Sequence, residues 1–198
     1  MTARIVILAS GSGTLLQALL DDDQQDFCAQ AVISDRADAF ALERARQAQV
    51  PGVVVSPGDF ATREQWNTAL ADAISTYSPD WIVCAGFMRI LGSDLVDRFT
   101  GRIVNSHPAL LPSFAGAHAI RDALNYGVAV SGCTIHLVDA GVDTGPIIAQ
   151  EPVVVLPDDD EASLHERIKV VERRLLLRIV RDLSRFGCTV TDRRVSIP

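Results

Sequence analysis

The sequence predicts an α/β protein with a doubly wound, mostly parallel sheet and helices on both faces. Two observations lead to this fold class. Over the first half of the chain, short apolar runs alternate with longer helical stretches, which is typical of parallel strands joined by helices. After Pro112 the pattern changes, because Cys133, Ile135 and Leu137 alternate with more polar residues, as in a strand with one wetter face.

The first half of the chain carries the strand–helix alternation. Ile5–Ala9 is apolar and largely β-branched, and the turn Ser10–Gly13 stops it, so we expect a buried strand and then a helix from Thr14 to about Leu20. Asp38 is the expected N-cap of the next helix. Further strands are expected at residues 31–33, 53–55, 81–85 and 102–105, and further helices at residues 38–47, 62–77 and 93–99.

The second half is expected to hold fewer and longer elements. A helix is predicted within Gly116–Gly127, and two strands at residues 132–138 and 147–155 flank an acidic, Gly-rich loop. The last predicted element is one long helix over residues 161–186. Its acidic start and its arginine-rich end suit the helix dipole, so we interpret these charges as structural.

The composition of the chain limits the kinds of partner that it is expected to bind. The chain has 198 residues and a net charge of -7, so we expect one domain that binds neither nucleic acid nor a membrane, although a local basic site could still bind an anion. The four cysteines are widely separated, which excludes a CxxC motif and a disulfide framework. The apolar stretch at the N-terminus is too short for a signal peptide, so we expect a cytoplasmic protein.

The turn Gly11–Thr14 lies between the first predicted strand and the first predicted helix. Backbone N–H groups at such a helix start can hold a phosphate, and Ser12 adds a hydroxyl. The dinucleotide fingerprint would need a third glycine at position 16, which is Leu16. We therefore favour a monophosphate site over a plain tight turn, and a dinucleotide site less than either.

Asn105 and His107 form the most informative motif. They stand where a predicted strand ends, and ligands of open α/β sheets bind beyond the carboxyl ends of strands. Pro108 and Pro112 stiffen the loop that follows. Most single histidines only fill structural roles, but this arrangement favours a functional one.

A second chemical motif is the loop from Asp139 to Pro146. Its two carboxylates and two glycines are also common in ordinary loops, but Asp143 precedes a rigid Thr-Gly-Pro turn. If Asp143 meets His107, we expect its charge to raise the pKa of the imidazole and to form an acid–base pair.

Other chemistries lack their motifs. There is no GxSxG nucleophile elbow and no Walker A sequence. The four histidines are too dispersed for a zinc site, so no metal is expected. The dispersed residues are His107, His118, His136 and His165.

Four segments together resemble the folate-dependent phosphoribosylglycinamide formyltransferases of purine biosynthesis. They are Asn105–Pro112, Ala85–Leu91, Gly132–His136 and Asp143–Pro146, and they occur in that family's order and spacing between Ile5 and about Arg185. The Asn, His and Asp residues are shared with other formyl-transfer enzymes and mark the chemistry more firmly than the substrate. At this length we do not expect the extra domain that the related tRNA enzymes and hydrolases carry.

The resemblance implies a Rossmann-like formyltransferase fold over residues 1–198, with a phosphate-binding half (1–100) and a folate-binding, catalytic half (101–198). It implies that the amine of glycinamide ribonucleotide takes the formyl group of 10-formyltetrahydrofolate, a co-substrate, on the route to IMP. The implied catalytic residues are Asn105, His107 and Asp143. The implied ribonucleotide-binding residues are Gly11, Ser12, Gly13, Thr14, Leu15 and Glu172. The implied folate-binding residues are Arg63, Met88, Arg89, Ile90, Leu91, Asn105, Asp139, Ala140, Gly141, Val142 and Asp143.

Two positions depart from the family pattern. Leu15 can offer only its backbone where relatives often have Asn or Ser, and Ala115 replaces a common proline before Gly116. A formyltetrahydrofolate hydrolase and a non-catalytic nucleotide- or folate-binding module stay open as alternatives. The oligomeric state, including a homodimer, is also left open.

Overall fold

The computed structural model describes residues 2–198, and the chain divides into a first compact unit ending at Val104 and a second beginning at Asn105. The sheet order is β3-β2-β1-β4-β5-β6-β7, and strand β5 (Ile103–His107) crosses the boundary between the units. β1 pairs in parallel with β2 and β4, β2 pairs in parallel with β3, and β6 and β7 are antiparallel. The predicted fold class, a doubly wound and mostly parallel α/β sheet with helices on both faces, is confirmed.

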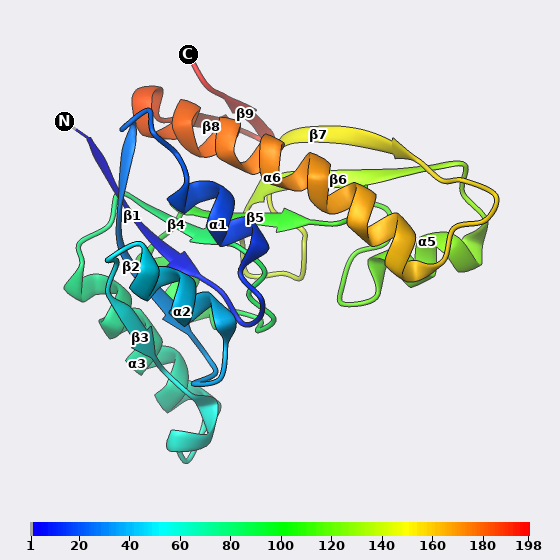
Figure 1. Ribbon diagram of the computed structural model, residues 1–198. Coiled ribbons are helices and arrows are strands. Elements are labelled where there is room, and N and C mark those ends of the chain that lie inside the picture. The colour runs from blue at the N-terminus through cyan, green and yellow to red at the C-terminus, as the bar shows by residue number, and fades with distance from the viewer. Residues whose placement is uncertain (1) are drawn as a thin grey trace. The chain divides into compact units, whose positions relative to one another are not determined.

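The first unit contains the central strands of the doubly wound sheet (Figure 1). In chain order its elements are β1 (Ala3–Leu8), α1 (Thr14–Leu20), β2 (Phe27–Ser34), α2 (Phe40–Gln47), β3 (Gly52–Val54), the short 3-10 helix η1 (Pro57–Asp59), α3 (Arg63–Thr76), β4 (Trp81–Cys84) and α4 (Ser93–Arg98). Apolar, mostly β-branched residues of β1, β2 and β4 are fully buried, including Ile5, Ile7, Ile33 and Ile82. Their burial explains why these runs form the middle of the sheet.

The strand order of the first unit reverses between β1 and β4. The chain runs outward from β1 to β2 and β3 on one side, and β4 lies on the other side. Open α/β sheets bind ligands outside the carboxyl ends of the strands at such a switch point. The Gly11–Thr14 turn follows β1, and residues 85–91 follow β4, so both segments start at this edge of the first unit.

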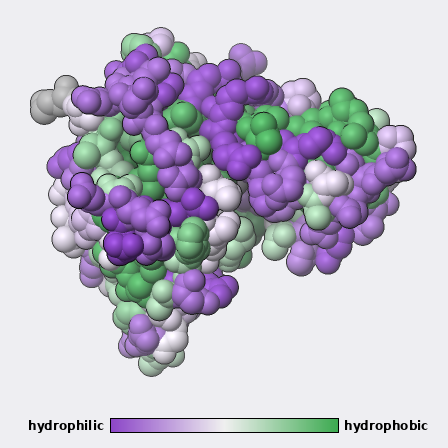
Figure 2. Space-filling view, viewed as in Figure 1, coloured by the Kyte–Doolittle hydropathy of each residue, from purple (hydrophilic) through white to green (hydrophobic). Residues whose placement is uncertain are grey.

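The second unit contains α5 (Ala119–Tyr126), β6 (Val130–Leu137), β7 (Ile147–Val154), α6 (Glu161–Phe186) and the hairpin β8 (Thr189–Thr191) and β9 (Arg194–Ser196). Helix α6, orange in Figure 1, packs on β6, β7 and α5. Its bounds are the predicted ones. Figure 2 shows mainly hydrophilic side chains over the exposed face of this helix.

The acidic start of α6 is structural, as the sequence indicates. Asp160 accepts a hydrogen bond from the Ser163 amide, and the Ser163 hydroxyl accepts one from the Asp160 amide, which forms a capping box. Asp159, just before the helix, pairs with Arg167 eight residues further on, and this pairing lowers the pKa of the Asp159 carboxyl.

Several predicted boundaries need correction. Asp38 does not cap α2, because its carboxylate binds the Arg36 guanidinium at 2.7 Å and Ala39 takes the N-cap position. The helix predicted within Gly116–Gly127 spans Ala119–Tyr126, inside the predicted range. β5 extends to His107, so the Asn-x-His motif lies within the strand end.

Some elements were absent from the prediction. The strands β8 and β9 of the hairpin and the helix η1 each have three residues, which is too short to produce a periodic pattern. None of the helices in residues 2–198 has both the length and the apolarity needed to cross a membrane.

Candidate active site

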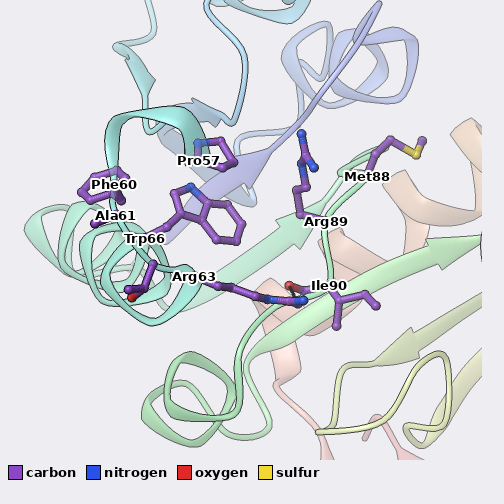
Figure 3. Close-up of a pocket in the computed structure, with 9 residues that line it drawn as sticks. Pro57, Phe60, Ala61, Arg63, Trp66, Met88, Arg89 and Ile90 are labelled. Atoms are coloured by element: carbon purple, nitrogen blue, oxygen red, sulfur yellow. Dashed lines mark hydrogen bonds between the residues drawn. The ribbon is translucent and has the colours of Figure 1, made fainter.

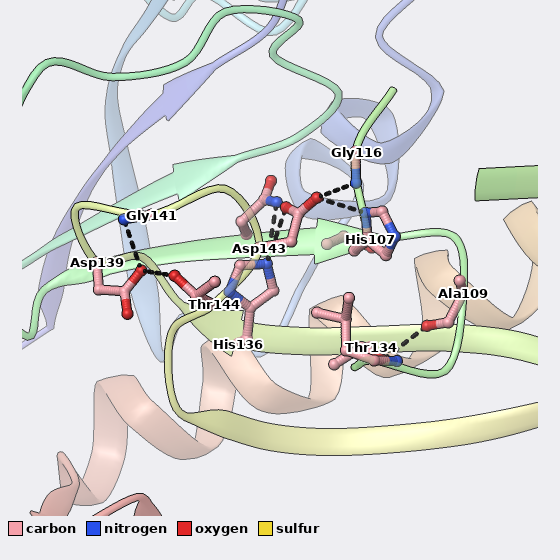
Figure 4. A network of polar contacts seen from close by, with 12 residues as sticks. His107, Ala109, Gly116, Thr134, His136, Asp139, Gly141, Asp143 and Thr144 are labelled. Carbon is pink, nitrogen blue, oxygen red and sulfur yellow. Dashed lines mark hydrogen bonds and ion pairs between the residues drawn. The ribbon is translucent and has the colours of Figure 1, made fainter. Parts of the chain in front are cut away.

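The carboxyl end of β5 positions the two motif residues of the second unit. Successive side chains of a strand point to opposite faces, so Asn105 and His107 share one face and Ser106 points to the other. Figure 4 shows the His107 side chain directed toward Asp143, which comes from the loop between β6 and β7.

His107 is held on both sides of its ring. Its Nδ1 lies 3.3 Å from Asp143 Oδ2, and its Nε2 donates to the Phe114 carbonyl at 2.8 Å. The side chain is almost completely buried. Burial lowers the pKa of His107, and the Asp143 charge and the Phe114 carbonyl only partly oppose this effect. The expected upward effect of Asp143 on this pKa is present, but the net shift is downward because burial, which the sequence does not show, has the larger effect.

Asp143 is the anionic centre of the site. Its Oδ2 accepts a hydrogen bond from the Gly116 amide at 2.8 Å, and its Oδ1 lies 3.6 Å from His136 Nε2. The neighbouring His136, the Gly116 amide and His107 lower the pKa of the Asp143 carboxyl, which therefore stays ionised at neutral pH.

Asn105 is oriented by a histidine, His136, for which the sequence predicted no role in the site. His136 of β6 is buried, and its Nδ1 donates to the Leu137 carbonyl at 2.9 Å. Its Nε2 then faces the Asn105 amide nitrogen at 3.2 Å. One N–H of the Asn105 amide is thus engaged, and the other is left for a ligand.

The loop after β5 is fixed by two side chains that the sequence did not single out. The Thr134 hydroxyl accepts from the Leu111 amide at 3.0 Å and donates to the Ala109 carbonyl at 2.7 Å. Gln150 of β7 donates to the Leu111 carbonyl at 2.8 Å. The loop that carries Phe114 is thereby tied to β6 and β7, which gives His107 a rigid support.

Phe114 itself has a strained backbone. Its φ is +56°, in the left-handed region that bulky residues rarely adopt. Its ring packs edge-on against Tyr126 of α5, with the centroids 5.9 Å apart. The residues on both sides of Ala115 form hydrogen bonds with the site. The Phe114 carbonyl accepts from His107, and the Gly116 amide donates to Asp143. The alanine in place of the family's proline therefore sits in a loop that is held from both ends.

The loop that carries Asp143 is closed by its own side chains. Asp139 Oδ1 accepts hydrogen bonds from the Gly141 amide at 3.1 Å and the Thr144 hydroxyl at 2.6 Å (Figure 4). A Cβ on Gly145 would lie 1.7 Å from the Leu137 carbonyl oxygen, so only glycine allows this return of the chain.

The Gly-rich turn of the first unit is braced by α2. Arg44 donates to the Ser12 carbonyl at 2.7 Å, and the Ala41 amide donates to the Gly11 carbonyl at 3.1 Å. Gly13 has a φ of +69°, and a Cβ there would lie 2.9 Å from Ala41 Cα. Leu15 is buried, so that only its backbone can face a ligand. Gly11 and Ser12 are exposed, and Thr14 is half-buried.

The first unit also contains a cavity of about 460 Å³, and four of the predicted folate-binding residues line it (Figure 3). Its lining consists of Pro57, Phe60, Ala61, Thr62, Arg63, Trp66, Met88, Arg89 and Ile90. Figure 3 shows Arg63 extending toward Ile90, whose carbonyl it binds at 3.0 Å. The Arg89 guanidinium pairs with the buried Asp35 at 2.7 Å. Leu91 is buried and is not part of the lining.

Glu172 lies on the face of α6 that is buried in the second unit. Its carboxylate accepts a hydrogen bond from the Ser106 hydroxyl at 2.7 Å, and its side chain is almost fully buried. Burial raises the pKa of Glu172, and the Ser106 hydrogen bond opposes this rise.

The arrangement in the second unit can stabilise a negative oxygen and move a proton. Asn105 supplies an amide donor, His107 a titratable ring, and Asp143 a negative charge beside that ring. Among residues 2–198, no three His, Cys, Asp or Glu side chains are placed to hold a metal ion together.

Comparisons with known proteins point to one family. The formyl transferase family model matches residues 3–180. Phosphoribosylglycinamide formyltransferase of Mycobacterium tuberculosis is 51% identical over 196 residues, which are 98% of this chain and 91% of that protein. The Escherichia coli protein of the same name is 40% identical over 174 residues, 86% of this chain and 82% of that protein.

Solved structures agree. Glycinamide ribonucleotide transformylase 1 from Symbiobacterium toebii superposes with a TM-score of 0.95 at 43% identity, and the match covers 99% of this chain and 94% of that one. The resemblance to the phosphoribosylglycinamide formyltransferases is confirmed. Since the family model covers most of the chain, the chain belongs to the formyl transferase family, whose members are formyl-transferring enzymes.

Proposed function

We propose that this protein transfers the formyl group of 10-formyltetrahydrofolate to the amine of glycinamide ribonucleotide, a step on the purine route to IMP. The observation that carries the proposal is the convergence of Asn105, His107 and Asp143 at the end of β5. The names of its relatives support this choice of acceptor.

The proposed reaction is a direct attack. The primary amine of the ribonucleotide adds to the formyl carbon, and the carbonyl oxygen becomes negative in the tetrahedral intermediate. The free N–H of Asn105 and the imidazolium of His107 donate hydrogen bonds to this oxygen. The C–N bond to the folate nitrogen then breaks, and that nitrogen takes up the proton that the amine loses.

Asp143 supports this reaction by its charge. Burial favours the neutral ring of His107, whereas the carboxylate at 3.3 Å favours the cation. In the reaction, Nε2 of His107 turns its N–H from the Phe114 carbonyl to the substrate oxygen. The ring can keep its proton there, because the negative charge of the intermediate also favours the cation. Because the positive charge of His107 is favoured when the negative intermediate forms, its hydrogen bond stabilises mainly the transition state. Interactions made mainly in the transition state raise kcat.

The ligand roles follow the resemblance residue by residue. In the first unit, the backbone of Gly11–Leu15 holds the ribonucleotide phosphate, and the cavity with Arg63 and Arg89 contributes to folate binding. In the second unit, the carboxylate of Glu172 accepts hydrogen bonds from the ribonucleotide, and the loop Asp139–Asp143 contributes to folate binding.

Binding of a non-reactive folate analogue is expected to change the fluorescence of Trp66, because this buried indole lines the cavity and donates to the Val55 carbonyl at 2.8 Å. The chain has two tryptophans, so each can be removed in turn. A titration of the Trp81→Phe variant should keep the signal, and the Trp66→Phe variant should lose it. A signal that survives without Trp66 would place the folate elsewhere.

The reaction is tested by supplying 10-formyltetrahydrofolate with and without glycinamide ribonucleotide. We expect formylated ribonucleotide and tetrahydrofolate in equal amounts, and little formate when the ribonucleotide is omitted. Rapid formate release that does not depend on the ribonucleotide would identify a hydrolase. Binding of both ligands without turnover would identify a non-catalytic module.

A further inference from the structure

Ser106 stands between the two candidate catalytic residues of β5 and has no part in the reaction described above. Because side chains alternate along a strand, it points away from Asn105 and His107. It reaches Glu172 of α6, and its hydroxyl donates to Oε1 at 2.7 Å. The strand that carries the reactive groups is thus bonded directly to a carboxylate on a separate element.

Glu172 needs such a partner. An ionised carboxylate that is almost completely buried is costly unless hydrogen bonds and charges compensate it. On its own helix, the charges of Lys169 and Arg173 reach it. On β6, the nearby group is the Cys133 thiol, which burial keeps neutral by raising its pKa to about 12. Ser106 is the side chain that β5 contributes.

We propose that Ser106 is a positioning residue that aims the Glu172 carboxylate at the ribonucleotide. This inference rests on the proposed function, in which Glu172 binds the ribonucleotide. The Ser106 hydroxyl occupies Oε1 and fixes the rotation of the carboxylate, so that Oε2 is presented to substrate hydroxyls in one orientation. Asn105 and His107 flank Ser106 on the same strand, so this bond also sets the carboxylate in register with the reacting groups.

The Ser106→Ala variant is expected to raise the KM for glycinamide ribonucleotide about tenfold, the usual effect of losing one hydrogen bond to a charged group. The kcat and the KM for the formyl folate should change less than twofold. Without the hydroxyl, the pKa of Glu172 rises further, so the pH below which ribonucleotide affinity declines should move upward. The Ser106→Thr variant keeps a hydroxyl and should restore both properties.

Ser131→Ala is the matched control. Ser131 is a buried serine on β6 whose hydroxyl has no partner among the described residues. Its loss should leave every kinetic constant unchanged. Thermal unfolding of each variant checks that the fold is retained.

The Glu172→Gln variant distinguishes a failure of the positioning role of Ser106 from a failure of the ribonucleotide-binding role of Glu172. If it raises the ribonucleotide KM and Ser106→Ala does not, the positioning role of Ser106 is wrong. If Glu172→Gln leaves this KM unchanged, the ribonucleotide role of Glu172 fails and the inference fails with it, whereas formyl transfer itself is judged by the product assay. A Ser106→Ala variant that weakens both substrates equally would indicate a purely structural role and also overturn the inference.

Discussion

Replacing His107 by alanine is expected to lower kcat/KM for formyl transfer by at least about a thousandfold. The variant loses a donor to the developing negative oxygen and leaves the Asp143 carboxylate without its cationic partner; each such contribution is typically worth roughly a hundredfold or more. The ring is buried beside the Phe114 carbonyl, so Asn is a second replacement that preserves a polar side chain. Steady-state rates with both substrates saturating separate the loss in kcat from any change in binding.

His165→Asn is the control for this experiment. This half-buried histidine lies on α6, and its substitution should leave the rate within about twofold of the parent protein. Both variants are compared by circular dichroism and urea unfolding. If His107→Ala retained near-parental turnover while folded, the proposed reaction would be wrong at its centre.

Asp143→Asn should reduce kcat by roughly a hundredfold or more, with only a small loss of stability. The amide oxygen of the new side chain can still accept from the Gly116 amide, so the loop has no reason to unfold. The negative charge beside His107 is lost. Since that charge opposes the effect of burial, the pKa of His107 should fall further in the variant.

The pH dependence of kcat/KM shows in which direction the pKa of His107 changes in Asp143→Asn. The limb of the kcat/KM profile that reports His107 should move to lower pH in Asp143→Asn, because a weaker base loses its proton earlier as pH rises. The exposed Asp122→Asn change on α5 removes the same charge away from His107 and should leave the profile in place. An unchanged profile in Asp143→Asn would show that the two side chains do not act as a pair.

The free energy of unfolding should also decrease as the pH falls. The pKa values of both His107 and Asp143 are lower in the folded protein than in the unfolded chain. Each group therefore stabilises the fold fully above its unfolded pKa, about 6.5 for His107 and 3.8 for Asp143, and this contribution is lost as pH falls. The site thus contributes to acid lability, first through the histidine and then through the carboxylate.

The parts of the fold that could be read from the sequence are those set by local patterns. The apolar run at Ile5 and the capped start of α6 each carry their signal within a few residues, and both elements formed as predicted. The position of Asn105 and His107 at a strand end was also readable, although they lie inside β5 and not beyond it.

Long-range contacts were not readable in this way. Thr134 fixes the loop after β5 from 23 residues away in the sequence, and Ser106 meets Glu172 from 66 residues away. No local pattern marks either contact. The net downward shift of the His107 pKa was not readable for a related reason, since burial is a property of the folded chain as a whole.

The left-handed backbone of Phe114 has a consequence for any attempt to make this protein more robust. A bulky residue in that conformation costs about 1–3 kcal/mol, and glycine at the same place would remove most of this cost. Glycine would also remove the ring that packs on Tyr126, and with it a contact that anchors the residue whose carbonyl holds His107. Selection for heat resistance and selection for turnover would thus act on this one position in opposite directions.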